Sequence, residues 1–240
     1  MAVLLLDIGN SRCKAVAYSQ GEFHLLASHH AADLNAFCIT EVLCSSVANA
    51  ERFAEIQQQT GLSQLRWTEI RSEASRHGLN NCYAQPELLG VDRWLAMLGA
   101  RTLWPAQPLL VIDAGTAITV DWVDAAGQHQ GGWILPGLRL LEKSVTTNTA
   151  KVFAQDGLQL SLQPGMSTGA CLQNGCLAAA TGALQAALQQ QQVAAVICTG
   201  GDAATLLPFL QATVPLQLDP LLIFRGLALY LPKTTELAKE

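Results

Sequence analysis

Short apolar runs separated by turn residues open the chain and predict three consecutive β-strands. Val3–Leu6 is an apolar run, Cys13–Tyr18 alternates loosely between apolar and polar positions, and Phe23–Leu26 follows after another turn. Runs of this length between turn signals are typical of strands. Gly9–Ser11 has the residue types of a tight turn, so we expect the first two strands to be joined there.

The same pattern returns in the second half of the chain and indicates an internal duplication. Asp113–Thr116 takes the place of Asp7–Asn10, so an Asp-x-Gly-[Asn/Thr] turn follows an apolar strand in both passages. The predicted strands of the second passage are Leu109–Ile112, Ile118–Val123 and Gln128–Leu135. Self-similarity along a chain is the signature of a repeated structural unit. We therefore predict two similar halves, over residues 1–103 and 104–240.

Alternating helix and strand patterns complete each half. In the first half, the predicted elements are a helix at Leu34–Phe37, a strand at Glu41–Ser46, and helices at Ala50–Gln59 and Gly90–Leu103. In the second half, they are a helix at Met166–Gln192 with a candidate break near Gly182, a strand at Val193–Cys198, a helix at Ala203–Leu210, and a last helix that starts near Asp219-Pro220 and ends at Tyr230.

Composition and charge narrow the class of protein. Half of the 240 residues are hydrophobic and 14% are charged, which excludes an extended disordered chain. The net charge of −5, without a lysine or arginine run, argues against nucleic acid as a partner. Neither a membrane-spanning run nor a secretory signal is evident. The 7 cysteines include no Cys-x-x-Cys pair, which favours reduced thiols over disulfides or zinc. We expect a globular, cytoplasmic protein that does not bind membranes.

The two Asp-x-Gly-[Asn/Thr] turns suggest a nucleotide cleft between the halves. A carboxylate at a strand end can hold Mg²⁺ directly or through water, and small turn residues let backbone N–H groups approach phosphate oxygens. Lys14 could supply a positive charge. Taken alone, either turn is better explained as an ordinary hairpin. The duplication favours the plan of the actin-like ATPase folds, in which two related halves hold phosphates without a Walker loop, and the chain has no Gly-x-x-x-x-Gly-Lys sequence.

Two further strings each have two interpretations. Asp92, in Gly90–Trp94, precedes an apolar helical stretch. It could cap the helix N-terminus, an interaction worth about 1 kcal/mol. It could instead be the base that deprotonates an acceptor hydroxyl, with Arg93 holding an anionic group of the substrate. Thr199–Asp202 follows a strand and could be a plain tight turn or a surface against which adenine lies.

Taken in order, these strings resemble the type III pantothenate kinases. The strings that carry the resemblance are Asp7–Ser11, Tyr83 with Gly90–Trp94, Asp113–Ala117, Gly131–Gly137 and Thr199–Gly201, and the resemblance extends from Asp7 to about Gly226. That family belongs to the acetate and sugar kinase/Hsp70/actin superfamily. The resemblance implies an α/β chain with a duplicated actin-like (ribonuclease H-like) ATPase fold around a nucleotide cleft. It also implies ATP-dependent phosphorylation of pantothenate, the first step of coenzyme A synthesis.

The resemblance also assigns expected roles, position by position. The ATP phosphates and Mg²⁺ are expected at Asp7, Ile8, Gly9, Asn10, Ser11, Arg12, Cys13 and Lys14, and a further ATP contact at Thr116. Pantothenate is expected at Tyr83, Gly90, Val91, Asp92 and Arg93, with Asp92 as the general base. Asp113 matches the ligand of a monovalent cation, K⁺ or NH₄⁺. Thr168 matches a threonine that reaches pantothenate from the neighbouring subunit, which implies a homodimer.

Some residues depart from the family pattern, and two rival functions remain. Ser11 stands where threonine is commoner, and Asn148–Phe153 keeps a Thr-Ala pair but lacks the usual histidine and proline. One rival is a nucleotide-binding regulator of the same fold without turnover, which would not need Asp92 as a base. The other is a kinase for a sugar or another small hydroxyl substrate, against which Tyr83 and Gly90–Arg93 argue.

Overall fold

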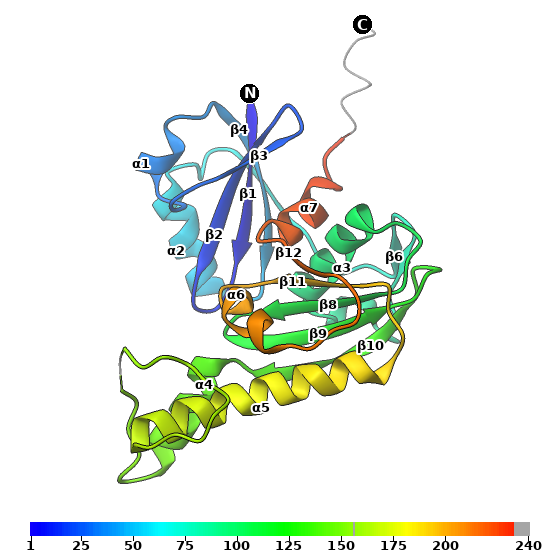
Figure 1. Ribbon diagram of the computed structural model, residues 1–240. Coiled ribbons are helices and arrows are strands. Elements are labelled where there is room, and N and C mark those ends of the chain that lie inside the picture. The colour runs from blue at the N-terminus through cyan, green and yellow to red at the C-terminus, as the bar shows by residue number, and fades with distance from the viewer. Residues whose placement is uncertain (156, 233–240) are drawn as a thin grey trace, which may run out of the picture. The chain divides into compact units, whose positions relative to one another are not determined.

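The computed structural model describes residues 1–155 and 157–232, in two compact units (Figure 1). Unit 1 contains Met1–Leu103 and the segment from Leu221 onward, and unit 2 contains Trp104–Pro220. The last helix is grouped with unit 1 because it packs on a helix of that unit. No helix in the described residues is long and apolar enough to span a membrane.

Unit 1 is built on a five-stranded mixed sheet in the order β3-β2-β1-β4-β5. Its strands are β1 (Ala2–Ile8), β2 (Cys13–Ser19), β3 (Glu22–Leu25), β4 (Ile39–Ser46) and β5 (Arg66–Glu69). The first three are antiparallel neighbours, while β4 and β5 run parallel to β1. The other elements are α1 (Ala31–Leu34), α2 (Ala50–Thr60), the hairpin β6 (Ser75–Arg76) and β7 (Leu79–Asn80), the 3₁₀ turn η1 (Pro86–Leu88), α3 (Val91–Leu103) and α7 (Leu222–Ala228).

Unit 2 repeats this topology, with the order β10-β9-β8-β11-β12. Its strands are β8 (Leu109–Ala114), β9 (Ala117–Val123), β10 (His129–Pro136), β11 (Ala195–Thr199) and β12 (Leu216–Leu218). Its helices are α4 (Leu138–Asn148), α5 (Thr168–Gln190), α6 (Ala203–Leu206) and the 3₁₀ turn η2 (Leu207–Phe209). Again, three strands are antiparallel and two run parallel to the first of them. The predicted duplication is therefore confirmed at the level of strand order and direction.

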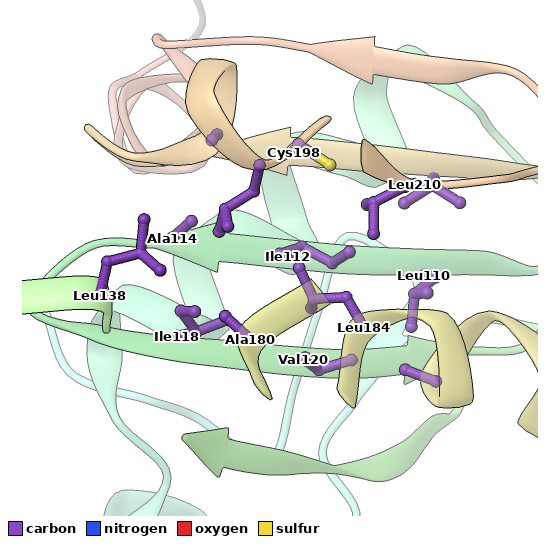
Figure 2. Packing of buried hydrophobic residues seen from close by; sticks show 14 of the residues in the cluster. Leu110, Ile112, Ala114, Ile118, Val120, Leu138, Ala180, Leu184, Cys198 and Leu210 are labelled. Atoms are coloured by element: carbon purple, nitrogen blue, oxygen red, sulfur yellow. The ribbon is translucent and has the colours of Figure 1, made fainter. Parts of the chain in front are cut away.

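Helix α5 covers one face of the unit 2 sheet and is continuous through Gly182, so the candidate break there was wrong. Leu177, Ala180, Leu184 and Ala187 recur at helical spacing and are buried in one apolar cluster with side chains of β8 and β9, as Figure 2 shows for several of them. A glycine in a helix interior costs only about 1 kcal/mol relative to alanine. Burial of this stripe outweighs that cost.

Several other expected elements differ in extent. The first helix is Ala31–Leu34 rather than Leu34–Phe37, because after Leu34 the chain makes only a turn, in which the Phe37 N–H donates to the Leu34 carbonyl at 3.0 Å. Helix α6 ends at Leu206 and continues as a 3₁₀ turn, since Pro208 has no N–H for an α-helical bond. The last helix begins at Leu222 rather than at Pro220. Strand β5 and helix α4 were not predicted.

Candidate active site

Asp7 lies at the carboxyl end of β1, between two neighbouring strands that supply its partners. Lys14 of β2 and Ser45 of β4 occupy the paired positions on either side of Asp7. The Ser45 hydroxyl donates to Asp7 Oδ1 at 3.2 Å. Lys14 was an expected site residue, whereas Ser45 was missed. The only sequence signal for Ser45 is a polar residue near the end of an apolar strand.

Burial raises the pKa of the Asp7 carboxyl to about 6. The charge of Lys14 and the hydrogen bond from Ser45 lower this pKa, while the negative charge of Asp92 raises it. Asp7 and Asp92, which are far apart in the sequence, are therefore close enough in unit 1 for their charges to interact. A partly buried carboxylate under these influences favours a nearby cation.

The two Asp-x-Gly turns close differently. In unit 1, Gly9 donates its N–H to the Arg12 carbonyl at 2.9 Å, and residues 9–12 lie between the paired residues Ile8 and Cys13. In unit 2, Gly115 donates to the Ala117 carbonyl at 2.9 Å, and residues 115–117 lie between the paired residues Ala114 and Ile118. The first turn is thus one residue longer than the second.

The residues expected at the ATP phosphates differ in their exposure to solvent. Asn10, Ser11 and Arg12 are exposed on the first turn. The side chain of Ile8, in contrast, is fully buried in the core of unit 1, so only its backbone could face a ligand. Burial, followed by the charge of Asp7, raises the pKa of the Cys13 thiol to about 12, which keeps it neutral at physiological pH.

Asp92 lies in the first turn of α3, and Gly90 precedes that helix. Gly90 accepts the first helical hydrogen bond, from the Trp94 N–H, at 3.1 Å. Asp92 Oδ1 accepts from the Arg93 N–H at 2.8 Å and lies only 2.6 Å from where a Cβ at Gly90 would be. The absence of a side chain at Gly90 therefore makes room for the Asp92 carboxylate.

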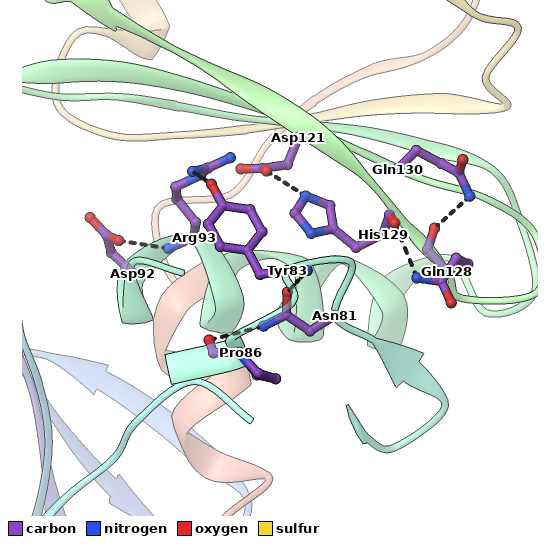
Figure 3. A network of polar contacts seen from close by, with 9 residues as sticks. All are labelled: Asn81, Tyr83, Pro86, Asp92, Arg93, Asp121, Gln128, His129 and Gln130. Atoms are coloured by element: carbon purple, nitrogen blue, oxygen red, sulfur yellow. Dashed lines mark hydrogen bonds and ion pairs between the residues drawn. The ribbon is translucent and has the colours of Figure 1, made fainter. Parts of the chain in front are cut away.

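Arg93 is a buried cation on α3 that reaches Tyr83. One guanidinium nitrogen, Nη1, donates to the Tyr83 hydroxyl oxygen at 3.1 Å. Arg93 as a whole is only 4% exposed to solvent. Figure 3 shows this contact together with Asp92 at the start of the helix. The structure thus brings together Tyr83 and Arg93, two of the residues expected at pantothenate.

In unit 2, Asp113 is the penultimate residue of β8 and lies beside Thr199 of β11 and Thr119 of β9. Gly200 follows Thr199 with a φ of 95°, and a Cβ there would lie 2.5 Å from Asp113 Oδ1 and 2.3 Å from the Ala114 carbonyl oxygen. The glycine is required both by this backbone conformation and by the close approach of Asp113. The string Thr199–Gly201 therefore forms one wall around the Asp113 carboxylate.

Gly137 supports the second turn from the other side. It donates its N–H to the Thr116 carbonyl at 3.0 Å, and a Cβ there would lie 2.2 Å from the Gly115 carbonyl oxygen. Thr116 itself is exposed. The Pro136-Gly137 pair thus packs directly against the turn that contains Thr116.

Thr168 is the first residue of α5 and is exposed, but it does not cap the helix. The capping residue is Ser167, whose hydroxyl oxygen accepts from the Ala170 N–H at 3.2 Å. Ser167 therefore supplies the cap of α5, and the Thr168 side chain is not needed for that bond.

No group of three or more His, Cys, Asp or Glu side chains in residues 1–155 and 157–232 could hold a metal ion by itself. A metal at Asp7 would thus rely on other ligands, as Mg²⁺ commonly does when it keeps waters and binds substrate phosphates. The single carboxylate at a strand end fits that mode of binding. In unit 2, a Cβ at Gly200 would come within 2.5 Å of both Asp113 Oδ1 and the Ala114 carbonyl oxygen, so these two oxygens lie close to each other.

Comparison with known proteins places these features in a family. A family model of the type III pantothenate kinases matches residues 3–190. A type III pantothenate kinase from Colwellia psychrerythraea is 35% identical over 221 residues, which cover 88% of this chain and 89% of that protein.

Two solved structures share the fold. A conserved protein assigned to the Baf family of transcriptional activators, from Campylobacter jejuni, is 24% identical over 93% of this chain and 94% of that chain, with a TM-score of 0.59. A protein named as a 2-dehydro-3-deoxygalactonokinase, from Sinorhizobium meliloti, is 15% identical over 94% of this chain and 97% of that chain, with a TM-score of 0.54. These likenesses concern the fold alone, and it is the match over residues 3–190 and the close relative that show the chain to belong to the type III pantothenate kinase family.

Proposed function

We propose that this type III pantothenate kinase, which transfers a phosphoryl group from ATP to pantothenate, uses Asp92 as its general base. The observation that carries the proposal is the electrostatic coupling of Asp92 to Asp7, at the end of β1. Asp7 belongs to the turn expected to hold the ATP phosphates. A base near that turn can accept the proton of a hydroxyl as the hydroxyl attacks the terminal phosphorus.

The phosphates of ATP bind at the first turn in this proposal. Exposed residues of the turn, Asn10–Arg12, present backbone N–H groups and a guanidinium, and Lys14 adds a second positive charge. Asp7 holds Mg²⁺ directly or through water, and the ion neutralises phosphate charge when bound. Thr116, on the exposed turn of unit 2, is proposed as a further ATP contact.

Pantothenate binds at Tyr83 and Arg93 in this proposal. The buried Arg93 guanidinium fixes the phenol of Tyr83 and supplies positive charge, which suits the carboxylate of pantothenate. Gly90 and Val91 give this segment its shape beside Asp92. Most of the catalysis then comes from holding the hydroxyl and the phosphate in line, in a charged site that needs little rearrangement.

A monovalent cation, K⁺ or NH₄⁺, is proposed at Asp113. Its carboxylate lies beside Gly200 and near the Ala114 carbonyl oxygen, since a Cβ at Gly200 would come within 2.5 Å of both oxygens. Oxygen donors of this kind suit a hard cation. The ion would balance the charge of a carboxylate at the end of a buried strand.

A homodimer, in the cytoplasm, completes the proposal. Thr168 is proposed to reach the pantothenate site of the partner subunit, and its exposure together with capping by Ser167 supports that role. Unit 2 has exposed apolar side chains on α4 and on the segment between α4 and α5: Leu140, Val145, Phe153, Leu162 and Met166. An interface with a second copy would cover such a surface.

The test is a panel of hydroxyl acceptors with ATP, for the wild-type chain and Asp92→Asn. We expect pantothenate to be the preferred acceptor, and a kcat for Asp92→Asn lower by roughly 10²–10⁴ with the fold intact, since the amide keeps the acceptor oxygen for the Arg93 N–H but is not a base. Near-normal turnover with a lowered melting temperature would make Asp92 a structural residue. Absence of turnover with every acceptor would favour the nucleotide-binding regulator, and preference for a sugar would favour the other kinase.

A further inference from the structure

Tyr83 lies in an irregular segment between β7 and α3, in which the regular structure is the short 3₁₀ turn Pro86–Leu88. A strand or a helix fixes its side chains through its own backbone bonds, whereas an irregular segment depends on side chains for its conformation. The position of the Tyr83 phenol therefore depends on whatever holds this segment in place.

Asn81 holds this segment with all the hydrogen-bonding groups of its carboxamide. Its Nδ2 donates to the Glu73 carbonyl at 3.2 Å and to the Pro86 carbonyl at 3.1 Å. Its Oδ1 accepts from the Tyr83 N–H at 3.0 Å. Figure 3 shows the carboxamide between Pro86 and the Tyr83 backbone. Both N–H donors and the oxygen of one side chain are thus engaged, and the contact to Tyr83 has the spacing of an Asx-turn.

The partners of Asn81 are themselves anchored to unit 1. The Asn81 backbone N–H donates to the Ala74 carbonyl at 2.9 Å. At the other end of the segment, the buried Ser72 hydroxyl donates to the Leu89 carbonyl at 2.7 Å. The segment between Asn81 and Leu89 is therefore tied at both ends to residues 72–74.

We propose that Asn81 is a positioning residue for pantothenate binding, which acts by fixing the backbone that presents Tyr83 to the Arg93 guanidinium. This inference rests on the proposed function, in which Tyr83 contacts pantothenate. Asn81 fixes the backbone of Tyr83 and Arg93 holds its hydroxyl, so both ends of the tyrosine are set before substrate arrives. Preorganisation of this kind lowers the cost of binding.

The first experiment measures steady-state kinetics for Asn81→Ala. Loss of the carboxamide should raise the KM for pantothenate by about tenfold, while the KM for ATP and kcat change by less than about twofold. Asn81→Ser retains a hydroxyl that can accept the Tyr83 N–H and should give an intermediate KM for pantothenate. If Asn81→Ala does not fold, Asn81→Ser takes its place in the same comparison.

The matched control is Asn49→Ala, which removes a different asparagine contact in unit 1. The Asn49 side chain accepts from the Arg52 N–H at 2.9 Å and caps α2. Its loss should lower the melting temperature, through a cap worth about 1 kcal/mol, and leave the KM for pantothenate unchanged. If a general loss of stability were the cause, the KM for pantothenate would change to the same extent in Asn81→Ala and Asn49→Ala. A positioning role changes this KM only in Asn81→Ala.

A double-mutant cycle with Tyr83→Ala decides whether Asn81 acts through Tyr83. If it does, Asn81→Ala should have little further effect on the KM for pantothenate once the tyrosine side chain is absent. Full additivity, or equal changes in the KM values for pantothenate and ATP, would overturn the positioning role. Tyr83→Ala with a normal KM for pantothenate would instead refute the proposed site, so the two failures are distinguishable.

Discussion

Asp7 is a residue whose environment opposes its own ionisation. Burial is the largest influence on its carboxyl and raises the pKa to about 6, although Lys14 and Ser45 act in the opposite direction. Functional sites commonly keep charged groups in such unfavourable surroundings, because the ligand supplies the compensation. Here the compensating group would be the cation that accompanies the phosphates.

The stability of the protein without nucleotide or divalent metal should therefore depend on Asp7 and pH. Between about pH 4 and pH 6 the folded state holds a proton on Asp7 that the unfolded chain has released, so this residue makes stability fall as pH rises. Asp7→Asn removes the effect. We expect the variant to be similar to wild type in urea unfolding near pH 4, and more stable by up to about 3 kcal/mol at pH 8. Parallel stability curves would contradict the raised pKa.

The substitution Gly200→Ala tests the proposed cation site at Asp113 by adding a single methyl group. Gly200→Ala would place a Cβ 2.5 Å from Asp113 Oδ1 in a backbone conformation with a φ of 95°. We expect the carboxylate to shift, so that the ratio of the initial rates in K⁺ and Na⁺ at matched ionic strength falls to about one. Wild-type rates should be higher in K⁺ or NH₄⁺ than in Na⁺.

The control for this variant is Gly131→Ala. Gly131 has a φ of 96°, which gives nearly the same backbone strain, but nothing lies within 4 Å of its added Cβ. This variant should lose stability and keep the preference for K⁺. If Gly200→Ala keeps the preference for K⁺ over Na⁺, or if the wild-type rates are equal in all three salts, the proposed cation site at Asp113 is wrong.

Sequence patterns single out the charged residues of the proposed site more readily than neutral residues such as Ser45 and Asn81. Asp7, Asp92 and Asp113 each follow or begin a recognisable element, so the residue type and its place already indicate chemistry. Ser45 and Asn81 have no such signal, because their roles depend on which distant strand or carbonyl lies beside them. The pairing of Ser45 with Asp7 joins distant strands, whereas Asn81 bonds residues within eight positions of it in a segment without regular structure, so neither partner follows from a sequence pattern.

At the scale of elements, the packing of α3 against α7 depends on two glycines. A Cβ at Gly99 would lie 2.1 Å from the Leu222 carbonyl oxygen, and a Cβ at Gly226 would lie 2.2 Å from the Leu95 carbonyl oxygen. Each helix thus presents a glycine to the backbone of the other. This close contact explains why the last helix belongs to unit 1, and it fixes the helix whose first turn contains Asp92.

We expect Gly99→Ala to destabilise the protein by about 1–3 kcal/mol, because the methyl group meets backbone that cannot move aside without separating the helices. Gly182→Ala is the matched control, since Gly182 also lies within a helix but has open space around it. That variant should gain up to about 1 kcal/mol in chemical denaturation. Equal effects of the two alanines would show that the α3–α7 contact is not tight.

The antiparallel strands were predicted more accurately than the elements that pack beside them. The three antiparallel strands of each unit are contiguous in sequence, so turn residues and apolar runs were enough to locate them. Strand β5, at Arg66–Glu69, is a short edge strand with polar residues and is defined by its pairing with β4. Helix α4 was missed although Leu138, Leu141 and Val145 have helical spacing, because polar residues interrupt the pattern.

At the scale of the whole molecule, the two units share one topology but differ in the residues beside the aspartate of each Asp-x-Gly turn. At the position that pairs with the turn aspartate, unit 1 has Lys14 and unit 2 has Thr119. In the proposed function, residues of unit 1 neutralise the negative charge of the ATP phosphates, and a monovalent cation binds in unit 2. The duplication could be predicted from sequence, whereas the assignment of the last helix could not, since its packing is decided by Gly99 and Gly226.

The proposed dimer would form through a surface of unit 2. The first half of α5 runs beyond the strands of its sheet beside α4 (Figure 1). Phe153 is 58% exposed and Met166 is fully exposed in the same region as Thr168. Because Ser167 caps α5, a bulky substitution at Thr168 leaves the capping bond in place. Thr168→Trp therefore tests a contact with the partner subunit rather than the stability of the helix.

Co-expression of Asp92→Asn and Thr168→Trp chains tests whether each site draws on both subunits. Each variant alone should be nearly inactive. In a mixed dimer, one site contains both substitutions, Asp92→Asn and Thr168→Trp. The other site combines an intact Asp92 with an intact Thr168 from opposite chains. Random pairing makes about half of the dimers mixed, so about a quarter of wild-type activity should return. Ser167→Ala, which removes only the cap, should reduce stability and keep activity. A demonstrably mixed dimer without recovered activity would confine the site to one chain and exclude Thr168 from it.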